Sequence, residues 1–97
     1  MNSKIQSVHF DADQKLTDFI QKKIAKLERF SDKITYAEVT LKLDKDQECG
    51  NKVATIVVDL PGDQLVAERK CKSFEEAVDL SIDALKKQID KYKAKTL

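Results

Sequence analysis

The period of the hydrophobic residues changes along this chain, and this change constrains the fold more than any other feature of the sequence. Between residues 14 and 30, apolar side chains recur every three or four positions, which predicts an amphipathic helix. From residue 34 the period falls to two, which is typical of half-buried strands. The helical period returns after Cys71. The sequence therefore predicts strands combined with two long helices.

Both predicted helices have start signals. Asp13 is the expected N-cap of the first helix, which should stop near Ser31 and Asp32. Its apolar face is predicted to be Leu16, Phe19, Ile20, Ile24, Leu27 and Phe30. The last helix should follow Ser73, which can form a Ser-x-x-Glu capping box with Glu76. Its inward stripe is predicted to be Phe74, Ala77, Val78, Ser81, Leu85, Ile89 and Tyr92.

Four segments read as strands. They are residues 4–10, 34–43, 52–60 and 64–71. In the second of these, Val39, Leu41 and Leu43 should share the buried face. The polar segment 44–51 and the "LPGDQ" segment at 60–64 are predicted turns. The fourth strand is the most charged of the strands that follow the first helix, which favours a place near a sheet edge.

The predicted element order is β-α-β-β-β-α. Two amphipathic helices need a common apolar surface, and the alternating face of a four-stranded sheet supplies it. We therefore expect an α+β two-layer sandwich with both helices on one face. The 97 residues should form a single domain, residues 1–97, because nothing in the sequence marks a linker or a repeat.

The composition points away from membranes and secretion. No apolar run is long enough to span a bilayer, and the N-terminal residues alternate instead of forming a signal peptide, so we expect a soluble cytoplasmic protein. Cys49 and Cys71 are far apart and form no CxxC pair, which predicts reduced structural thiols. A redox-sensing role for Cys49 is the alternative interpretation.

Enzyme motifs are missing from the sequence. Only two glycines are present, which excludes a glycine-rich phosphate loop, and no GxSxG or HExxH pattern occurs. His9 is the single histidine, too few ligands for a zinc site. We therefore expect no enzymatic activity, no cofactor, no metal and no small-molecule substrate.

Charges are segregated along the last helix, although the net charge is only +1. Its first half contains Glu75, Glu76, Asp79 and Asp83, and its second half contains Lys86, Lys87, Asp90, Lys91, Lys93 and Lys95. Matching of the helix macrodipole explains such a pattern, but that effect fades within one turn of each end. Binding of a polyanion, which would relieve the repulsion between the lysines, explains it equally well.

Cations also form a stripe on the first helix. Lys15, Lys22, Lys26, Arg29 and Lys33 fall within about 60° of one another on a helical projection. The residues alone favour a solvated flank, and an anion-binding stripe is the alternative. Because both helices are expected on one side of the sheet, their cationic flanks can merge, with Arg69, Lys70 and Lys72 extending the surface. The scarcity of aromatic residues there favours contacts to phosphates and RNA shape over base stacking.

Three segments carry a resemblance to a known family. They are "IQKKIAKLERFSDKI", "EVTLKLDK" and "FEEAVDLSIDALKKQIDKYKAK". Together they resemble the bacterial ribosome hibernation promoting factor family, also called ribosome-associated inhibitor A or sigma-54 modulation protein. The similarity covers essentially the whole chain, in the short form of the family. It implies the same β-α-β-β-β-α fold, akin to a double-stranded-RNA-binding domain.

The resemblance also implies a function. Family members bind the small ribosomal subunit between head and body, where they block mRNA and tRNA and keep idle ribosomes inactive. The implied partners are ribosomal RNA phosphates and ribosomal proteins. The motifs imply RNA contacts at Lys23, Lys26, Lys42, Lys45, Lys87, Lys91, Lys93 and Lys95, to which helical geometry adds Lys22, Arg29 and Lys86. The second hypothesis is a protein-interaction module that modulates a sigma factor through an exposed sheet face or the acidic segment 75–83.

Overall fold

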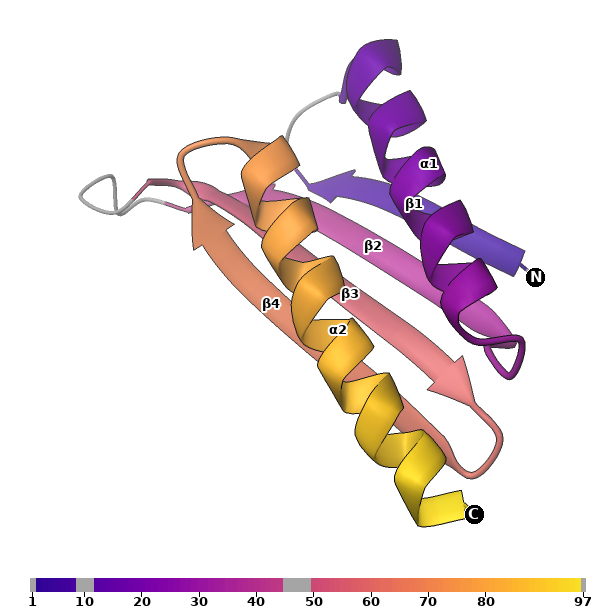
Figure 1. The fold of residues 1–97 in the computed structure, drawn as a ribbon. Helices are drawn as coiled ribbons and strands as arrows, with labels where there is room; N and C mark the ends of the chain where they lie inside the picture. Colours follow the sequence, from indigo (N-terminus) through magenta and orange to yellow (C-terminus); the bar gives the residue numbers. More distant parts are fainter. Residues whose placement is uncertain (1, 9–11, 45–49, 97) are drawn as a thin grey trace.

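The structure is a computed structural model that describes residues 2–8, 12–44 and 50–96. Its elements follow the predicted order, as Figure 1 shows. They are β1 (Asn2–Val8), α1 (Gln14–Phe30), β2 (Tyr36–Leu43), β3 (Lys52–Leu60), β4 (Asp63–Cys71) and α2 (Phe74–Thr96). The period of the hydrophobic residues therefore identified every element. Only the starts and ends of some strands differ from the prediction.

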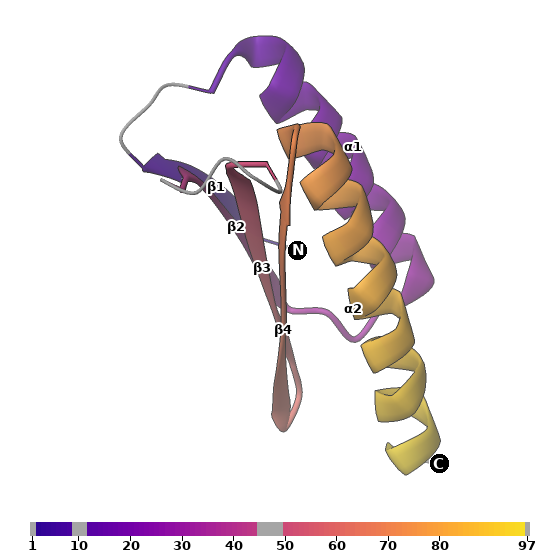
Figure 2. The same cartoon turned by 90° about the vertical axis from the view of Figure 1, so that its left-hand side faces the viewer.

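The strands form one four-stranded sheet in the order β1-β2-β3-β4. β1 pairs with β2 in parallel, and the other two pairs are antiparallel. Both helices cover the same face of this sheet, which is clearest in the side view of Figure 2. The predicted α+β two-layer sandwich is confirmed, and β4 is an edge strand as expected.

Strand boundaries are where the sequence prediction was least accurate. β1 begins at Asn2 instead of residue 4, and the predicted strand residues 9 and 10 lie outside the described residues. β2 begins at Tyr36, because Ile34 is buried in the connection from α1 and does not pair in the sheet. The predicted turn at 44–51 lies mostly outside the described residues.

The helix caps agree with the sequence. The Asp13 carboxylate accepts a 2.8 Å hydrogen bond from the backbone N–H of Leu16, which satisfies a donor at the start of α1 and contributes about 1 kcal/mol. Ser31 is the C-cap of the same helix. At α2, the Ser73 hydroxyl accepts a 3.2 Å hydrogen bond from the backbone N–H of Glu76, which is one of the two bonds of a capping box.

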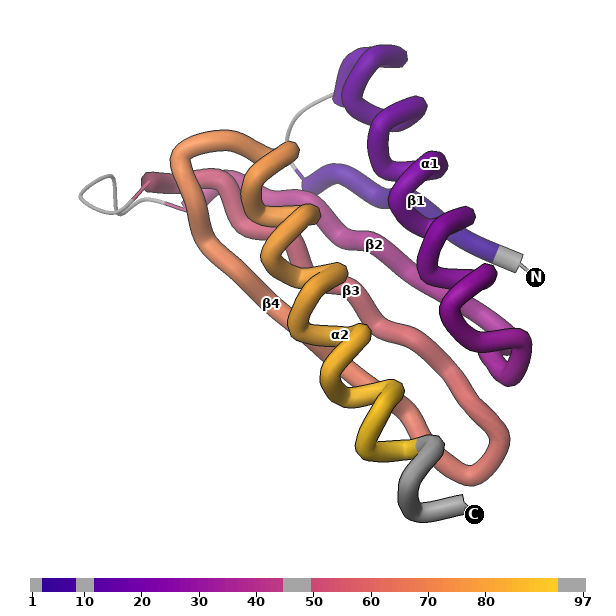
Figure 3. Tube along the Cα trace, in the orientation of Figure 1, coloured from indigo at the N-terminus to yellow at the C-terminus, as the bar shows by residue number. Residues whose placement is uncertain are grey.

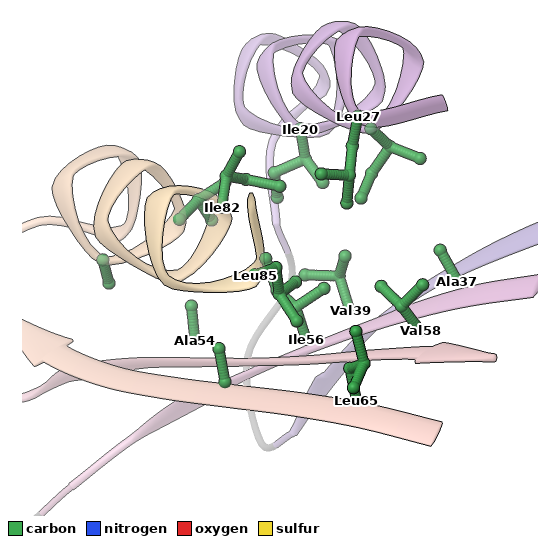
Figure 4. Packing of buried hydrophobic residues seen from close by; sticks show 14 of the residues in the cluster. Ile20, Leu27, Ala37, Val39, Ala54, Ile56, Val58, Leu65, Ile82 and Leu85 are labelled. Atoms are coloured by element: carbon green, nitrogen blue, oxygen red, sulfur yellow. The ribbon is translucent and has the colours of Figure 1, made fainter. Parts of the chain in front are cut away.

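The core lies between the helix layer and the sheet (Figure 4). Its largest fully buried side chains include Ile20 and Leu27 from α1, Ile56 from β3 and Leu85 from α2. α2 also approaches β3 closely, because Ser81 and Ala54 are both small and both fully buried. The Ser81 hydroxyl donates a 3.4 Å hydrogen bond to the Ala54 carbonyl, so this buried hydroxyl has a hydrogen-bond partner.

Three details of the predicted core differ. Ile82 is only 3% exposed, although the predicted stripe of α2 omitted it. Leu43 was expected to be buried but is 47% exposed, because this end of β2 extends past the start of α2 (Figure 1). Phe19 and Phe30, predicted for the apolar face of α1, are half-buried and pack at the border of the core.

Candidate nucleic-acid interface

The two helices run side by side in the same direction, as the trace in Figure 3 shows. An ion pair joins them: Lys23 Nζ lies 2.7 Å from Asp79 Oδ1. The same ammonium lies 5.3 Å from the centroid of the Phe19 ring, in a cation–π contact. These contacts identify the flank of α1 that faces α2, and they engage the charge of Lys23 inside the protein.

Next to this flank, the outer side of α1 forms a shallow groove of about 430 Å³. Its lining residues, all from α1, are Phe19, Lys22, Lys23, Ala25, Lys26 and Arg29. Lys22, Lys26 and Arg29 are exposed, and none of them forms an ion pair with any described residue. We call these three residues the α1 cation cluster. Their charges are available to an anionic partner.

The lysines of α2 lie on different flanks of that helix. Lys86 follows Asp79 by seven positions, which returns to within about 20° of the same direction, so it lies on the α1-facing flank. Lys91 lies on the opposite flank, where it lines a pocket together with Asp63 and Leu65 of β4. Lys87 is exposed between the two flanks. The cations of α2 therefore divide between two sides of the helix.

Lys42 lies on the other layer of the molecule. Leu41 faces the helices and is fully buried, and the next residue of a strand points to the opposite face. Lys42 therefore projects from the sheet face that the helices leave uncovered. It does not join the α1 cation cluster, although the resemblance implies RNA contacts both for Lys42 and for Lys26 of that cluster.

Three of the predicted contacts involve side chains outside the described part of the chain. Lys45 lies outside the described residues. Lys93 and Lys95 belong to α2, but the described part of the chain does not include their side chains. Of the sites predicted from the sequence, the structure brings Lys22, Lys23, Lys26 and Arg29 into one groove, and among these Lys23 is paired with Asp79. The contact of Asp79 with Lys23 was not predicted because it depends on how the two helices pack. The contact of Phe19 with Lys23 could have been found from their i, i+4 spacing on α1.

Of the remaining titratable candidates, Cys71 lies among the described residues. Burial raises the pKa of the Cys71 thiol above its ordinary value, and the charge of Glu76 adds to this effect, whereas Arg69 opposes it. A buried protonated thiol is a poor nucleophile, which fits the structural role expected for Cys71. Cys49 and His9 lie outside the described residues. Among the described residues, no group of three or more His, Cys, Asp or Glu side chains could hold a metal ion.

Nor does any helix in the described part of the chain combine the length and the apolarity that crossing a membrane requires.

Comparison with known proteins gives a consistent match. The family model described as "Sigma 54 modulation protein / S30EA ribosomal protein" matches residues 3–96. A ribosome hibernation promoting factor from Pseudomonas putida is 33% identical over 95 residues, covering 98% of this chain and 89% of that protein. The ribosome hibernation promotion factor of Bacillus subtilis is 33% identical over 97 residues, covering 98% of this chain and 50% of that protein.

Solved structures agree with this match. A ribosomal subunit interface protein from Coxiella burnetii superposes with a TM-score of 0.84 at 26% identity, over 97% of this chain and 99% of that one. The N-terminal domain of Thermus thermophilus Protein Y gives a TM-score of 0.79 at 29% identity, over 95% and 99%. The chain therefore belongs to the Sigma 54 modulation protein / S30EA ribosomal protein family, which includes the ribosome hibernation promoting factors.

Proposed function

We propose that this chain is a ribosome hibernation factor that binds the small ribosomal subunit at the decoding region and blocks mRNA and tRNA binding. The names of its relatives support a hibernation role, and ribosome binding would place the protein in the cytoplasm. The observation that carries the proposal is the α1 cation cluster, three exposed charges in one groove without a carboxylate partner among the described residues.

The spacing of this cluster suits an RNA backbone. Lys22 and Lys26 are about 6 Å apart along the helix axis, and Arg29 follows after about 4.5 Å, so the three side chains can reach neighbouring phosphates. Contacts to phosphates fix the position of a protein on RNA without reading its sequence. Steric exclusion of mRNA and tRNA then follows from occupancy alone, and no bond has to be made or broken.

The test compares two double variants of equal charge. Lys22→Gln/Lys26→Gln should lower affinity for small subunits about tenfold, and should reduce the magnitude of the log–log salt slope by roughly 1.5. Lys4→Gln/Lys52→Gln removes two cations outside both the groove and the predicted basic surface, and should bind nearly as the wild type does. Co-sedimentation with small subunits across a salt series measures both quantities. Equal losses in the two variants would show that net charge, not the α1 cluster, determines binding.

The second candidate function is a protein-interaction module that modulates a sigma factor. The observation that favours it is Val66, which is 48% exposed on the sheet face left uncovered by the helices. A partner held there would be captured from lysate equally well with and without ribonuclease, and its binding would depend little on salt. Loss of the captured material after ribonuclease treatment supports the ribosomal proposal.

A further inference from the structure

A second pocket lies where α2 passes over β4, away from the α1 groove. Its volume is about 170 Å³, and it is lined by Asp63, Leu65, Gln88, Lys91 and Tyr92. Leu65 and the Tyr92 ring supply apolar surface, Asp63 a carboxylate and Lys91 an ammonium group. The proposed contact of Lys91 with a phosphate uses only one of these features.

The walls of this pocket are held in place by hydrogen bonds to the β3–β4 hairpin. The Tyr92 hydroxyl donates to the Pro61 carbonyl at 2.8 Å, and Gln88 Nε2 donates to the Val66 carbonyl at 3.0 Å. The Asp63 carboxylate accepts from the backbone N–H of Gln64 at 2.8 Å, which fixes one of its oxygens. A ligand would therefore bind without the entropic cost of ordering these side chains.

The two charges of the pocket restrict the ligand that fits. A phosphate alone would be attracted by Lys91 and repelled by Asp63. An arginine from a protein partner would meet the opposite conflict, because it suits Asp63 and is repelled by Lys91. A nucleotide satisfies both charges, since its phosphate is anionic and its base carries N–H donors. Its planar base can also stack on the aromatic ring of Tyr92.

The carboxylate further selects among the bases. Guanine presents two adjacent donors on its Watson–Crick edge, N1–H and N2–H, which match the two oxygens of a carboxylate. Uracil presents two carbonyl oxygens around a single N–H, and these repel a carboxylate. The volume is below the roughly 300–1,000 Å³ of pockets that enclose a whole drug-sized ligand, so a base would enter while sugar and phosphate stay outside.

We infer that the pocket lined by Asp63, Lys91 and Tyr92 binds an unpaired guanine of ribosomal RNA. The inference rests on the proposed function for the identity of the RNA. Asp63 accepts hydrogen bonds from the base, Tyr92 stacks on it, and Lys91 contacts its phosphate. The α1 cluster then holds the backbone, while this pocket reads one base.

The test measures binding of the isolated full chain to two short RNAs, r(UUGUU) and r(UUUUU), by fluorescence anisotropy. The wild type should bind the guanine-containing RNA about fivefold or more tightly, which is the lower end of the effect of one bidentate base contact. Asp63→Asn should abolish this preference and weaken binding of r(UUGUU). Asp90→Asn, a matched control, removes an exposed carboxylate outside the pocket and should keep the preference.

The sign of the Asp63→Asn effect decides between base recognition and simple electrostatics. Loss of a negative charge beside Lys91 would strengthen binding to every RNA if only phosphates were contacted. Equal binding of the two RNAs by the wild type, undetectable binding of both, or tighter binding by Asp63→Asn overturns the inference. Co-sedimentation with small subunits is measured separately. If it fails while the guanine preference is present, the ribosomal proposal is wrong and the pocket assignment stands.

Discussion

Lys23 and Asp79 form a 2.7 Å ion pair that joins the middle of α1 to the first half of α2. The Lys23 side chain is 26% exposed, and its ammonium also lies over the Phe19 ring. Lys22 and Lys26, on the same helix, have no carboxylate partner among the described residues. Neighbouring lysines of α1 therefore differ in their contacts: Lys23 connects the two helices, whereas Lys22 and Lys26 are exposed and form no ion pair with a described residue.

Lys23→Met should leave the salt dependence of small-subunit binding unchanged, because the charge of Lys23 is already paired. Lys26→Met should reduce the magnitude of the log–log slope by about 0.7–0.9, the contribution of one phosphate contact. Lys23→Met should also cost no more than about 1 kcal/mol of unfolding free energy, since the pair is partly exposed. Equal reductions of the slope would mean that the ion pair opens when RNA binds.

The fold could be predicted from the sequence because each element has its own local signal. The change of hydrophobic period identified the order of the elements, and Asp13 and Ser73 marked the starts of both helices. Ile82 was missed because periodicity gives the centre of an apolar stripe but not its width. In the structure the stripe of α2 is wider, since this helix packs on α1 as well as on the sheet, and Figure 4 shows Ile82 extending toward α1.

Ile82→Ala should therefore cost about 2–5 kcal/mol of unfolding free energy, the range for truncating a buried aliphatic side chain to alanine. Leu80→Ala is the matched control on the same helix, because Leu80 is 43% exposed and its truncation should change stability by about 0.5 kcal/mol or less. Urea denaturation followed by circular dichroism measures both. A small effect of Ile82→Ala would show that its burial contributes little to the core.

The candidate site was less predictable than the fold, because it depends on which flanks of the helices meet. The sequence identified Lys22, Lys26 and Arg29 as a stripe, and the structure places them in one groove. It could not reveal that Lys23 pairs with Asp79 or that Lys91 shares a pocket with Asp63, since each pair joins two elements. Lys42 is remote from the helices for a local reason, the alternation of side chains along β2.

The two glycines provide a test of backbone constraint. Gly50 has φ +95°, and a Cβ there would lie 2.4 Å from the backbone carbonyl atoms of Cys71. Gly62 has φ +78° in the β3–β4 turn, with open space around the same position. Gly62→Ala should lower the free energy of unfolding by about 1–2 kcal/mol, because alanine is strained in the left-handed conformation. Gly50→Ala should cost more, because β4 must also move. Thermal denaturation of the two variants measures their loss of stability. Equal losses would contradict the predicted clash at Gly50.

Stability should decrease at alkaline pH partly because of Cys71. Burial raises the pKa of its thiol in the folded protein, whereas in the unfolded chain the thiol titrates near its ordinary pKa of about 8.5. Below that pH both states are protonated, and the thiol adds no pH dependence. Above it, unfolding releases a proton, so the free energy of unfolding falls as pH rises.

Cys71→Ala removes this titration and should show a shallower decline between pH 8 and pH 10 than the wild type, although truncating a buried residue lowers its stability at every pH. Lysine and tyrosine titrations are common to both proteins, so they cancel in the difference. Urea denaturation at each pH, with a reducing agent that keeps thiols free, measures the difference in unfolding free energy between the two proteins. Parallel stability curves for the two proteins would show that the thiol ionises equally in both states, and that burial does not protect it.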